Sequence, residues 1–309
     1  MLQQTRIETV IRYFDAFMTA FPTITTLADS DLEKVYRIWA GLGYYQRAKN
    51  IWKTAQILKN RYAGTVPDEY EALIHLPGIG AYTASAILSI AFNQPYPAVD
   101  GNVLRVVTRM KGWFENVLDK KTVLQVTQFL NNIVPTEHCS EFTQAWMELG
   151  ETHCSKQSPD CVACPLESLC YARIHAVTDK LPVRIKDRQR AIENRAVFFI
   201  QPSPKELVIT KKRIGLLAEL WELPNFEFPK DFSQNHPPKQ LSYPGLPIEF
   251  TYIASLKHDF THKRWNLFIY QGKIKQDSPM DSDWQIIQRD ALDQYPMATA
   301  FTKVRKLFI

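Results

Sequence analysis

The sequence predicts two domains of different class: an all-helical domain over residues 1–177 and a smaller mixed α/β domain over residues 196–309. Apolar residues recur with a helical period in the first and with a period of two in the second. Residues 178–195, which lie between them, are polar, basic and nearly free of large apolar side chains, which is typical of a linker. A chain of 309 residues is long enough to bury two cores.

Helical periodicity defines the first domain. Apolar side chains from Ile7 to Phe21 are spaced three or four residues apart, and Pro22 ends that helix. Nothing before Cys154 shows the alternation expected of a strand. Glycines and prolines divide the remainder into further helices, which we expect at residues 31–42, 48–62, 70–75, 81–92, 101–110, 120–134 and 141–151.

Alternating apolar residues define the second domain. We expect a short helix near the end of the chain, at residues 301–308. Strands are expected at residues 196–200, 206–210, 250–256, 265–272 and 284–288. Several short strands with few helices predict a small mixed α/β domain.

Bulk composition favours a nucleic-acid partner and excludes a membrane protein. The net charge is +5, and the positive excess lies after residue 177, so a DNA contact in the helical domain must come from local geometry. No run approaches the ~20 apolar residues of a membrane span, and no secretion signal is evident. Free thiols need a reducing compartment, so we expect a cytoplasmic protein, associated with the nucleoid through DNA.

Four of the five cysteines, Cys154, Cys161, Cys164 and Cys170, follow one another with the spacing C-x6-C-x2-C-x5-C. Four thiolates supplied by one short stretch are what an iron–sulfur cluster or a structural zinc requires. Zinc knuckles usually contain two C-x2-C pairs and this run contains one, so the spacing favours a [4Fe–4S] cluster over zinc or two disulfides. Cys139 is left over, and we expect it to be a small buried residue.

A tight corner is expected at Leu76-Pro77-Gly78-Ile79-Gly80. Proline ends one helix, two glycines permit a sharp turn, and a helix of small residues follows. Backbone N–H groups at the start of that helix would form an anion site for a DNA phosphate, with Gly78 and Gly80 allowing close approach. An ordinary corner between two helices is the alternative.

Asp100 lies twenty residues after Gly80 and directly before the helix expected at residues 101–110. An aspartate at this position is more often an N-cap than a catalyst. What changes this balance is its combination with the glycine corner and the four-cysteine loop.

This combination of helix–hairpin–helix, aspartate and cysteine loop resembles the endonuclease III superfamily of DNA glycosylases, over nearly all of residues 1–175. Members that also cleave the strand carry a lysine early in the second hairpin helix, where its amine attacks the sugar. Tyr82 stands there in this sequence, which implies a monofunctional glycosylase.

Further segments resemble the adenine DNA glycosylase (MutY) family, namely MLQQT, WAGLGYYQRAKN, GLLAELWELP and Phe260-Thr261-His262. The resemblance implies removal of adenine mispaired with 8-oxoguanine or guanine, after the adenine is flipped into a pocket. It implies that Asp100 stabilises the positively charged sugar, while Asn102 and Tyr82 order the sugar and the base. Double-stranded DNA is then the partner, and we expect a monomer.

The resemblance also implies a lesion-reading surface. Tyr44 matches an aromatic wedge inserted beside the lesion, although a tyrosine in the core is the alternative. Other lesion-side contacts would come from Gln4, Thr5, Leu42, Phe260, Thr261 and His262. The second domain resembles the Nudix (MutT-like) fold, but residues 215–228 lack the glutamate cluster that holds Mg²⁺ in Nudix hydrolases. We therefore expect this domain to bind 8-oxoguanine without hydrolysing nucleotides.

One departure concerns the catalytic glutamate of the family, which protonates adenine. In the family this glutamate lies two residues before the methionine that Met1 matches, so the printed sequence does not include it. General acid catalysis supplies roughly 10²–10⁴-fold in rate, so we expect the chain as printed to excise adenine poorly. A printed sequence that begins downstream of the true start would explain the missing glutamate. The alternative is a catalytically silent protein that binds A:8-oxoguanine mispairs. The second domain argues against a thymine- or pyrimidine-directed glycosylase.

Overall fold

The computed structural model describes the whole chain except residues 4, 6, 186–189, 212–214, 216, 230, 247, 261–262, 275–280 and 309. It contains two compact units, and the first is discontinuous in sequence. This unit combines Met1–Lys59 with Gln189–Ile309, and the second consists of Asn60–Arg188. Among the described residues, no helix combines the length and the apolar character that crossing a membrane would require.

The first unit begins with four helices, α1 (Ile7–Ala20), α2 (Ile24–Ala28), α3 (Leu32–Trp39) and α4 (Tyr45–Arg61), the last of which runs on into the second unit. Helix α2 was not expected from the sequence. It is only five residues long, and Thr23 and Thr26 start it by forming a reciprocal capping box.

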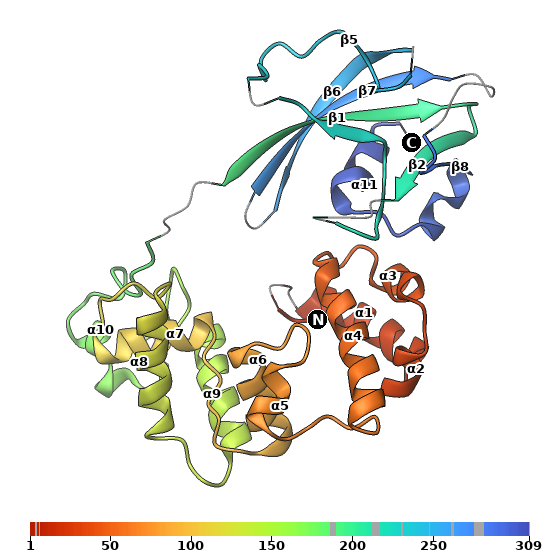
Figure 1. Cartoon of the computed structure of the whole chain (residues 1–309). Coiled ribbons are helices and arrows are strands. Elements are labelled where there is room, and N and C mark those ends of the chain that lie inside the picture. Colours follow the sequence, from red (N-terminus) through yellow and green to blue (C-terminus); the bar gives the residue numbers. More distant parts are fainter. Residues whose placement is uncertain are drawn as a thin grey trace. The chain divides into compact units, whose positions relative to one another are not determined.

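The rest of the first unit contains two sheets (Figure 1). The larger has the order β4-β1-β7-β6-β5, and the smaller has the order β3-β2-β8. The strands are β1 (Ala191–Gln201), β2 (Glu206–Lys211), β3 (Trp221–Glu222), β4 (Asn225–Glu227), β5 (Gln240–Ser242), β6 (Glu249–Asp259), β7 (Lys263–Lys273) and β8 (Trp284–Gln288). A 3₁₀ helix (Arg289–Gln294) and α11 (Thr299–Arg305) complete the unit. The expected mixture of strands and one terminal helix is confirmed.

Strand β1 corrects the expected linker. It begins at Ala191, inside the segment 178–195, and pairs in parallel with β7 from Ala191↔Lys263 onward. The polar residues at its start make specific contacts, such as the hydrogen bond from Trp265 Nε1 to Glu193. Composition alone therefore hid five residues of strand.

Apolar side chains cover both faces of the larger sheet. Val197 and Phe199 of β1 point into one cluster, which also holds residues of α1, α3, α4 and α11. Ala196, Phe198 and Ile200, on the other face of β1, point into a second cluster with Phe250 and Tyr270. Burial on both faces explains the continuous apolar run of this strand.

The second unit is helical, as expected. Its main elements are α5 (Tyr70–Ile74), α6 (Ala81–Ala86), a π-helix (Ile87–Ala91), α7 (Gly101–Lys111), α8 (Lys120–Asn131), α9 (Cys139–Thr152), a 3₁₀ turn (Glu167–Leu169) and α10 (Tyr171–Ile174). Val103 and Val107 of α7 pack against Val126 and Leu130 of α8 in a buried cluster. The expected helix 81–92 changes from α to π winding after Ala86.

Candidate functional site

The corner between α5 and α6 has the geometry that its glycines require. Gly78 has φ 78°, a left-handed conformation that favours glycine. Gly80 is the N-cap of α6 and offers no side-chain cap to the first N–H groups of that helix. Both glycines are exposed, while Leu76 is buried beneath them. The corner therefore presents uncapped backbone donors at the surface of the second unit, as an anion site requires.

Asp100 and Tyr82 lie near each other in the second unit. Burial raises the pKa of the Tyr82 phenol, and the nearby Asp100 carboxylate raises it further. Asp100 is the N-cap of α7, where its Oδ1 accepts from the backbone N–H of Val103 at 2.8 Å. Capping and a second role are compatible, because the cap uses only one of the two carboxylate oxygens.

Asn102 is fixed on the same turn of α7 by two neighbours. A side chain at Gly150 of α9 would bring its Cβ within 2.6 Å of the Asn102 Cβ, so the two helices approach closely there. Arg105 Nη2 donates to the Asn102 side-chain oxygen at 2.9 Å. Asp100, Asn102 and Tyr82 are thus brought together near the start of α7.

Arg105 is a residue that sequence reasoning missed. Its guanidinium also donates to the carbonyl oxygen of Gly150 at 2.6 Å and to that of Cys154 at 2.7 Å. Burial lowers its pKa, while Cys154 and Asp100 act in the opposite direction. The only signal in the sequence was an arginine one helical turn after Asn102.

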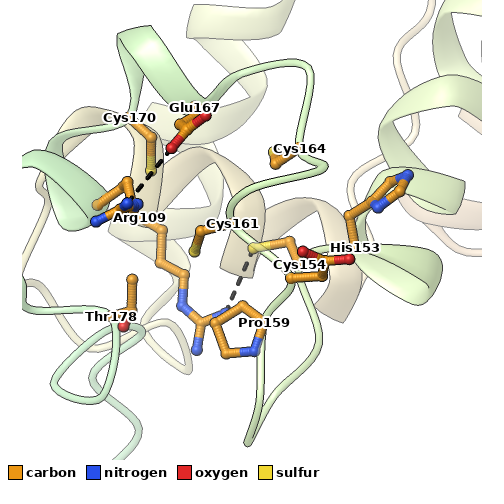
Figure 2. A pocket seen from close by; sticks show the side chains of 11 residues that line it. Arg109, His153, Cys154, Pro159, Cys161, Cys164, Glu167, Cys170 and Thr178 are labelled. Atoms are coloured by element: carbon orange, nitrogen blue, oxygen red, sulfur yellow. Dashed lines mark hydrogen bonds and ion pairs between the residues drawn. The ribbon is translucent and has the colours of Figure 1, made fainter.

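The four cysteines of the loop surround one small cavity, which Figure 2 shows from close by. Cys154 follows α9, Cys161 and Cys164 lie in the loop, and Cys170 is the N-cap of α10. All four are free thiols and partly buried. Across the described ranges, no three His, Cys, Asp or Glu side chains converge closely enough to hold a single metal ion. The four thiols are instead spread around a shared space.

Arg109 provides positive charge at this cavity (Figure 2). Only 2% of its surface is exposed. Its guanidinium donates to Cys154 Sγ at 3.4 Å, to the carbonyl oxygen of Ser155 at 2.7 Å and to that of Leu181 at 2.8 Å. A buried cation that contacts carbonyls and a sulfur is suited to a negatively charged group beside it.

The electrostatics of the thiols also reflect their closeness. Burial raises the pKa of Cys161, and the charges of Cys170 and Cys154 raise it further. Burial likewise raises the pKa of Cys164. At the far end of the loop, the ring of Tyr171 lies where a side chain at Gly112 would sit, with an added Cβ only 2.5 Å away. This contact holds α10, and with it Cys170, against the end of α7.

A second site lies in the first unit, around Tyr44. This residue precedes α4 with φ 51°, and 48% of its surface is exposed. The Arg47 guanidinium lies 4.7 Å from the centre of its ring and donates to Thr5 Oγ1 at 3.0 Å. Leu42, by contrast, is 5% exposed. Arg47, which the sequence did not single out, therefore joins Tyr44 to the N-terminal segment.

Tyr44 and Phe260 line the same cavity although 216 positions separate them. Its volume is about 470 Å³. Other residues in its wall are Tyr36, Gly43, Tyr45, Gln46, Gly215, Leu217, Ala218, His258, Asp259, Ala298 and Thr299. The wall is mainly aromatic and apolar with a few polar groups, as in sites that bind a flat ring.

The predicted site residues therefore fall into two groups. Asp100, Asn102, Tyr82, the glycine corner and the cysteine loop belong to the second unit. Thr5, Leu42, Tyr44 and Phe260 belong to the first, and Leu42 is absent from the cavity wall. The predictions for Gln4, Thr261 and His262 lie outside the described residues.

Comparison with known families matches both parts of the chain. A profile described as "HhH-GPD superfamily base excision DNA repair protein" matches residues 1–135, and a NUDIX domain profile matches residues 196–307. The adenine DNA glycosylase of Buchnera aphidicola subsp. Acyrthosiphon pisum (strain APS) is 40% identical over 74% of this chain and 64% of its own length. That of Buchnera aphidicola subsp. Baizongia pistaciae (strain Bp) is 35% identical over 89% and 76%. The chain thus spans less than two thirds of the length of the first of these relatives and about three quarters of the length of the second.

Two solved structures each match more than half of this chain. A non-covalent endonuclease III–DNA complex is matched with a TM-score of 0.50 and 32% identity, over 57% of this chain and 80% of that one. A thermostable thymine-DNA glycosylase is matched with a TM-score of 0.52 and 25% identity, over 56% and 80%.

Proposed function

The chain belongs to the adenine DNA glycosylase family, and from that premise we propose that it releases adenine from mispaired DNA by hydrolysing the bond between base and deoxyribose. The predicted fold class is confirmed: a helix–hairpin–helix glycosylase domain precedes a sheet-rich Nudix-like domain. The observation that carries the proposal is the position of Asp100 at the start of α7, with Tyr82 beside it.

Asp100 supplies negative charge where a sugar would become positive. As base and sugar separate, the sugar takes on oxocarbenium character, and a nearby carboxylate lowers the energy of that state. The hydrogen bond from the Val103 N–H orients the carboxylate at the start of the helix. Asn102 and the neutral phenol of Tyr82 help to order the sugar and the base. No amine occupies the position of Tyr82, so base release should not be coupled to strand cleavage.

The DNA backbone is held by the glycine corner in this proposal. A phosphate accepts hydrogen bonds from the uncapped N–H groups at the start of α6, and Gly78 and Gly80 let it approach. The neutral overall charge of the helical half makes such directed donors necessary.

Cys154, Cys161, Cys164 and Cys170 are proposed to hold a [4Fe–4S] cluster. The donor set fits, because each thiolate in such a cluster bonds a separate iron, and the four thiols here surround a space instead of one point. Arg109 would offset the negative charge of four thiolates. When bound, the cluster supplies cross-linking of the loop, and the chemistry remains at Asp100.

The cavity of the first unit is proposed to read the base opposite the adenine. An 8-oxoguanine ring has the flat shape that the aromatic wall of Tyr44 and Phe260 suits. Gln4, Thr5, Leu42, Thr261 and His262 are the further proposed contacts, and Leu42 would act from beneath, because it is buried. The enzyme acts as a monomer on genomic DNA, in the reducing cytoplasm and at the nucleoid.

Single-turnover release of adenine tests this function. The protein is mixed in excess with duplexes that contain A:8-oxoguanine, A:G or A:T, and free adenine is measured over time. Release should be fastest from A:8-oxoguanine, with no strand cleavage before alkali treatment. Asp100→Asn should bind the first duplex with unchanged affinity and release adenine at least about 10³-fold more slowly. Tight binding without release by the wild-type protein would contradict the catalytic part of the proposal and favour the alternative, a catalytically silent protein that binds A:8-oxoguanine mispairs.

A further inference from the structure

Two ion-pair systems lie at the end of β6 and the start of β7, on either side of Phe260 in the sequence. Asp259 accepts from Arg264 at 2.6 and 3.0 Å and pairs with Arg190 at 3.1 Å. Lys263 pairs with Glu193 of β1. The Phe260 N–H donates to the Lys263 carbonyl oxygen at 2.8 Å. Phe260 is therefore hydrogen-bonded to a residue that pairs with the start of β1.

Glu193 is the centre of the second system. Its side chain is 19% exposed, and it accepts from the Trp265 indole N–H at 2.6 Å as well as from Lys263. Burial alone would raise the pKa of Glu193, but the hydrogen bonds from Lys263 and Trp265 outweigh it and lower the pKa. Glu193 therefore stays ionised while largely buried, because two donors satisfy it.

Trp265 transmits this constraint to the cavity. Its ring is 1% exposed and contacts the Phe260 ring edge to face, with 4.8 Å between the centres. The Arg195 guanidinium lies 4.8 Å from the centre of the same indole, is held by Asn225, and pairs with Glu193 at 3.7 Å. Phe260 in turn lines the cavity with Tyr44. A chain of contacts thus runs from Glu193 through Trp265 to Phe260.

We propose that Glu193 is a positioning residue for recognition of the base opposite adenine, acting through the Trp265 indole on Phe260. The proposal rests on the proposed function of the cavity. Aromatic contacts depend on ring placement, so an indole free to rotate would leave Phe260 in several positions and blur the difference between 8-oxoguanine and guanine. General affinity for duplex DNA does not depend on Glu193, since Glu193 contributes to the cavity only through other side chains.

The test measures dissociation constants for A:8-oxoguanine and A:G duplexes at one salt concentration. Glu193→Ala should reduce the preference for 8-oxoguanine by about tenfold, because it leaves a buried indole N–H without its acceptor. Affinity for the A:G duplex should change by less than about twofold. Glu193→Gln keeps an acceptor for that N–H and should retain the preference within about threefold. Glu249→Gln, at the exposed start of β6, is the matched control and should change nothing.

A double-mutant cycle separates positioning from general weakening. Trp265→Phe keeps a ring and removes the N–H, so it should lose about as much preference as Glu193→Ala. The double variant should lose no more than either single variant. Multiplied losses, or a loss in Glu193→Gln as large as in Glu193→Ala, would overturn the route through Trp265. Thermal unfolding of every variant identifies any that fail to fold.

The two proposals fail in different ways. If the wild-type protein shows no preference for 8-oxoguanine, the proposed lesion specificity is wrong and the positioning role falls with it. If the wild-type protein shows the preference and Glu193→Ala retains it, only the positioning role is overturned.

Discussion

The guanidinium of Arg105 donates to the carbonyl oxygen of Cys154 at 2.7 Å. One residue of α7 thereby binds the first cysteine of the loop, and the same side chain holds Asn102 at 2.9 Å. The proposed catalytic turn and the cysteine loop consequently share one half-buried cation. A disturbance at either end should be felt at the other.

Replacing Arg105 should therefore affect both catalysis and stability. Arg105→Met leaves the carbonyl oxygens of Gly150 and Cys154 without a donor, and we expect a loss of about 2–4 kcal/mol in the free energy of unfolding. Adenine release should slow by about tenfold or more, because Asn102 loses its partner. Single-turnover kinetics and urea unfolding measure the two effects. Arg61→Met, at an exposed arginine, should change neither, and a normal rate in Arg105→Met would limit its role to stability.

The cysteine loop makes a prediction about iron. Cys161→Ser should lose most of the bound iron and sulfide, together with the broad visible absorbance of an iron–sulfur cluster. Cys139→Ser should keep both, since the Cys139 thiol is buried away from the loop and donates to the Pro135 carbonyl. Iron and zinc analysis of purified protein checks this result. One zinc per chain in colourless protein would contradict the assignment.

Tyr44 makes a prediction about DNA binding. Its half-exposed ring is held by Arg47, so it is ready to stack on a base. Base–aromatic stacking contributes about 1–3 kcal/mol, so Tyr44→Ala should weaken binding to an A:8-oxoguanine duplex by roughly 5- to 150-fold. Phe114→Ala removes a ring of similar exposure in the other unit and serves as the control. Equal effects of the two substitutions would argue against a wedge.

Tyr270 makes a prediction about stability and pH. It is fully buried, and its hydroxyl has no hydrogen-bond partner among the described residues. Tyr270→Phe should therefore raise the free energy of unfolding at pH 7 by about 1 kcal/mol. Tyr295→Phe loses the hydrogen bond from Gln285 and should instead be neutral or slightly destabilising.

The sign of the pH effect follows from the pKa. Burial, with a smaller effect of Tyr252, raises the pKa of Tyr270 to about 12 in the folded state, against about 10 in the unfolded state. The stability that the neutral phenol contributes is complete below pH ~10 and is lost as the pH rises through ~12. Urea unfolding between about pH 9 and pH 12 measures this effect. The free energy of unfolding should decline less over that range in Tyr270→Phe than in the wild-type protein. Parallel curves would contradict this account.

The sequence was informative where local patterns decide the outcome. The cysteine spacing, the glycine corner and the helical periods each depend on residues close together, and the structure brings the four cysteines to one cavity. Asp100 could be read as an N-cap from position alone, and it is one. The short strands β3, β4 and β5 were missed because two or three residues are too few to show a period.

Long-range contacts to backbone could not be read in the same way. Arg105 and Arg109 act largely on carbonyl oxygens some 45 to 72 positions away, and a carbonyl leaves no trace in the sequence. Arg47 and Glu193 join elements whose pairing depends on the fold. The start of β1 was misassigned for this reason, since its polar residues resemble a linker until their partners on β7 are known.

The discontinuity of the first unit has a consequence for synthesis on the ribosome. Asn60–Arg188 emerges as one uninterrupted stretch, whereas Met1–Lys59 must wait for the last part of the chain to complete its unit. At roughly 5–20 residues per second, that wait lasts on the order of tens of seconds. The cysteine loop can therefore fold and take up the proposed cluster early, while the cavity of Tyr44 and Phe260 forms last. In the interval, the apolar faces of the first helices are available to chaperones.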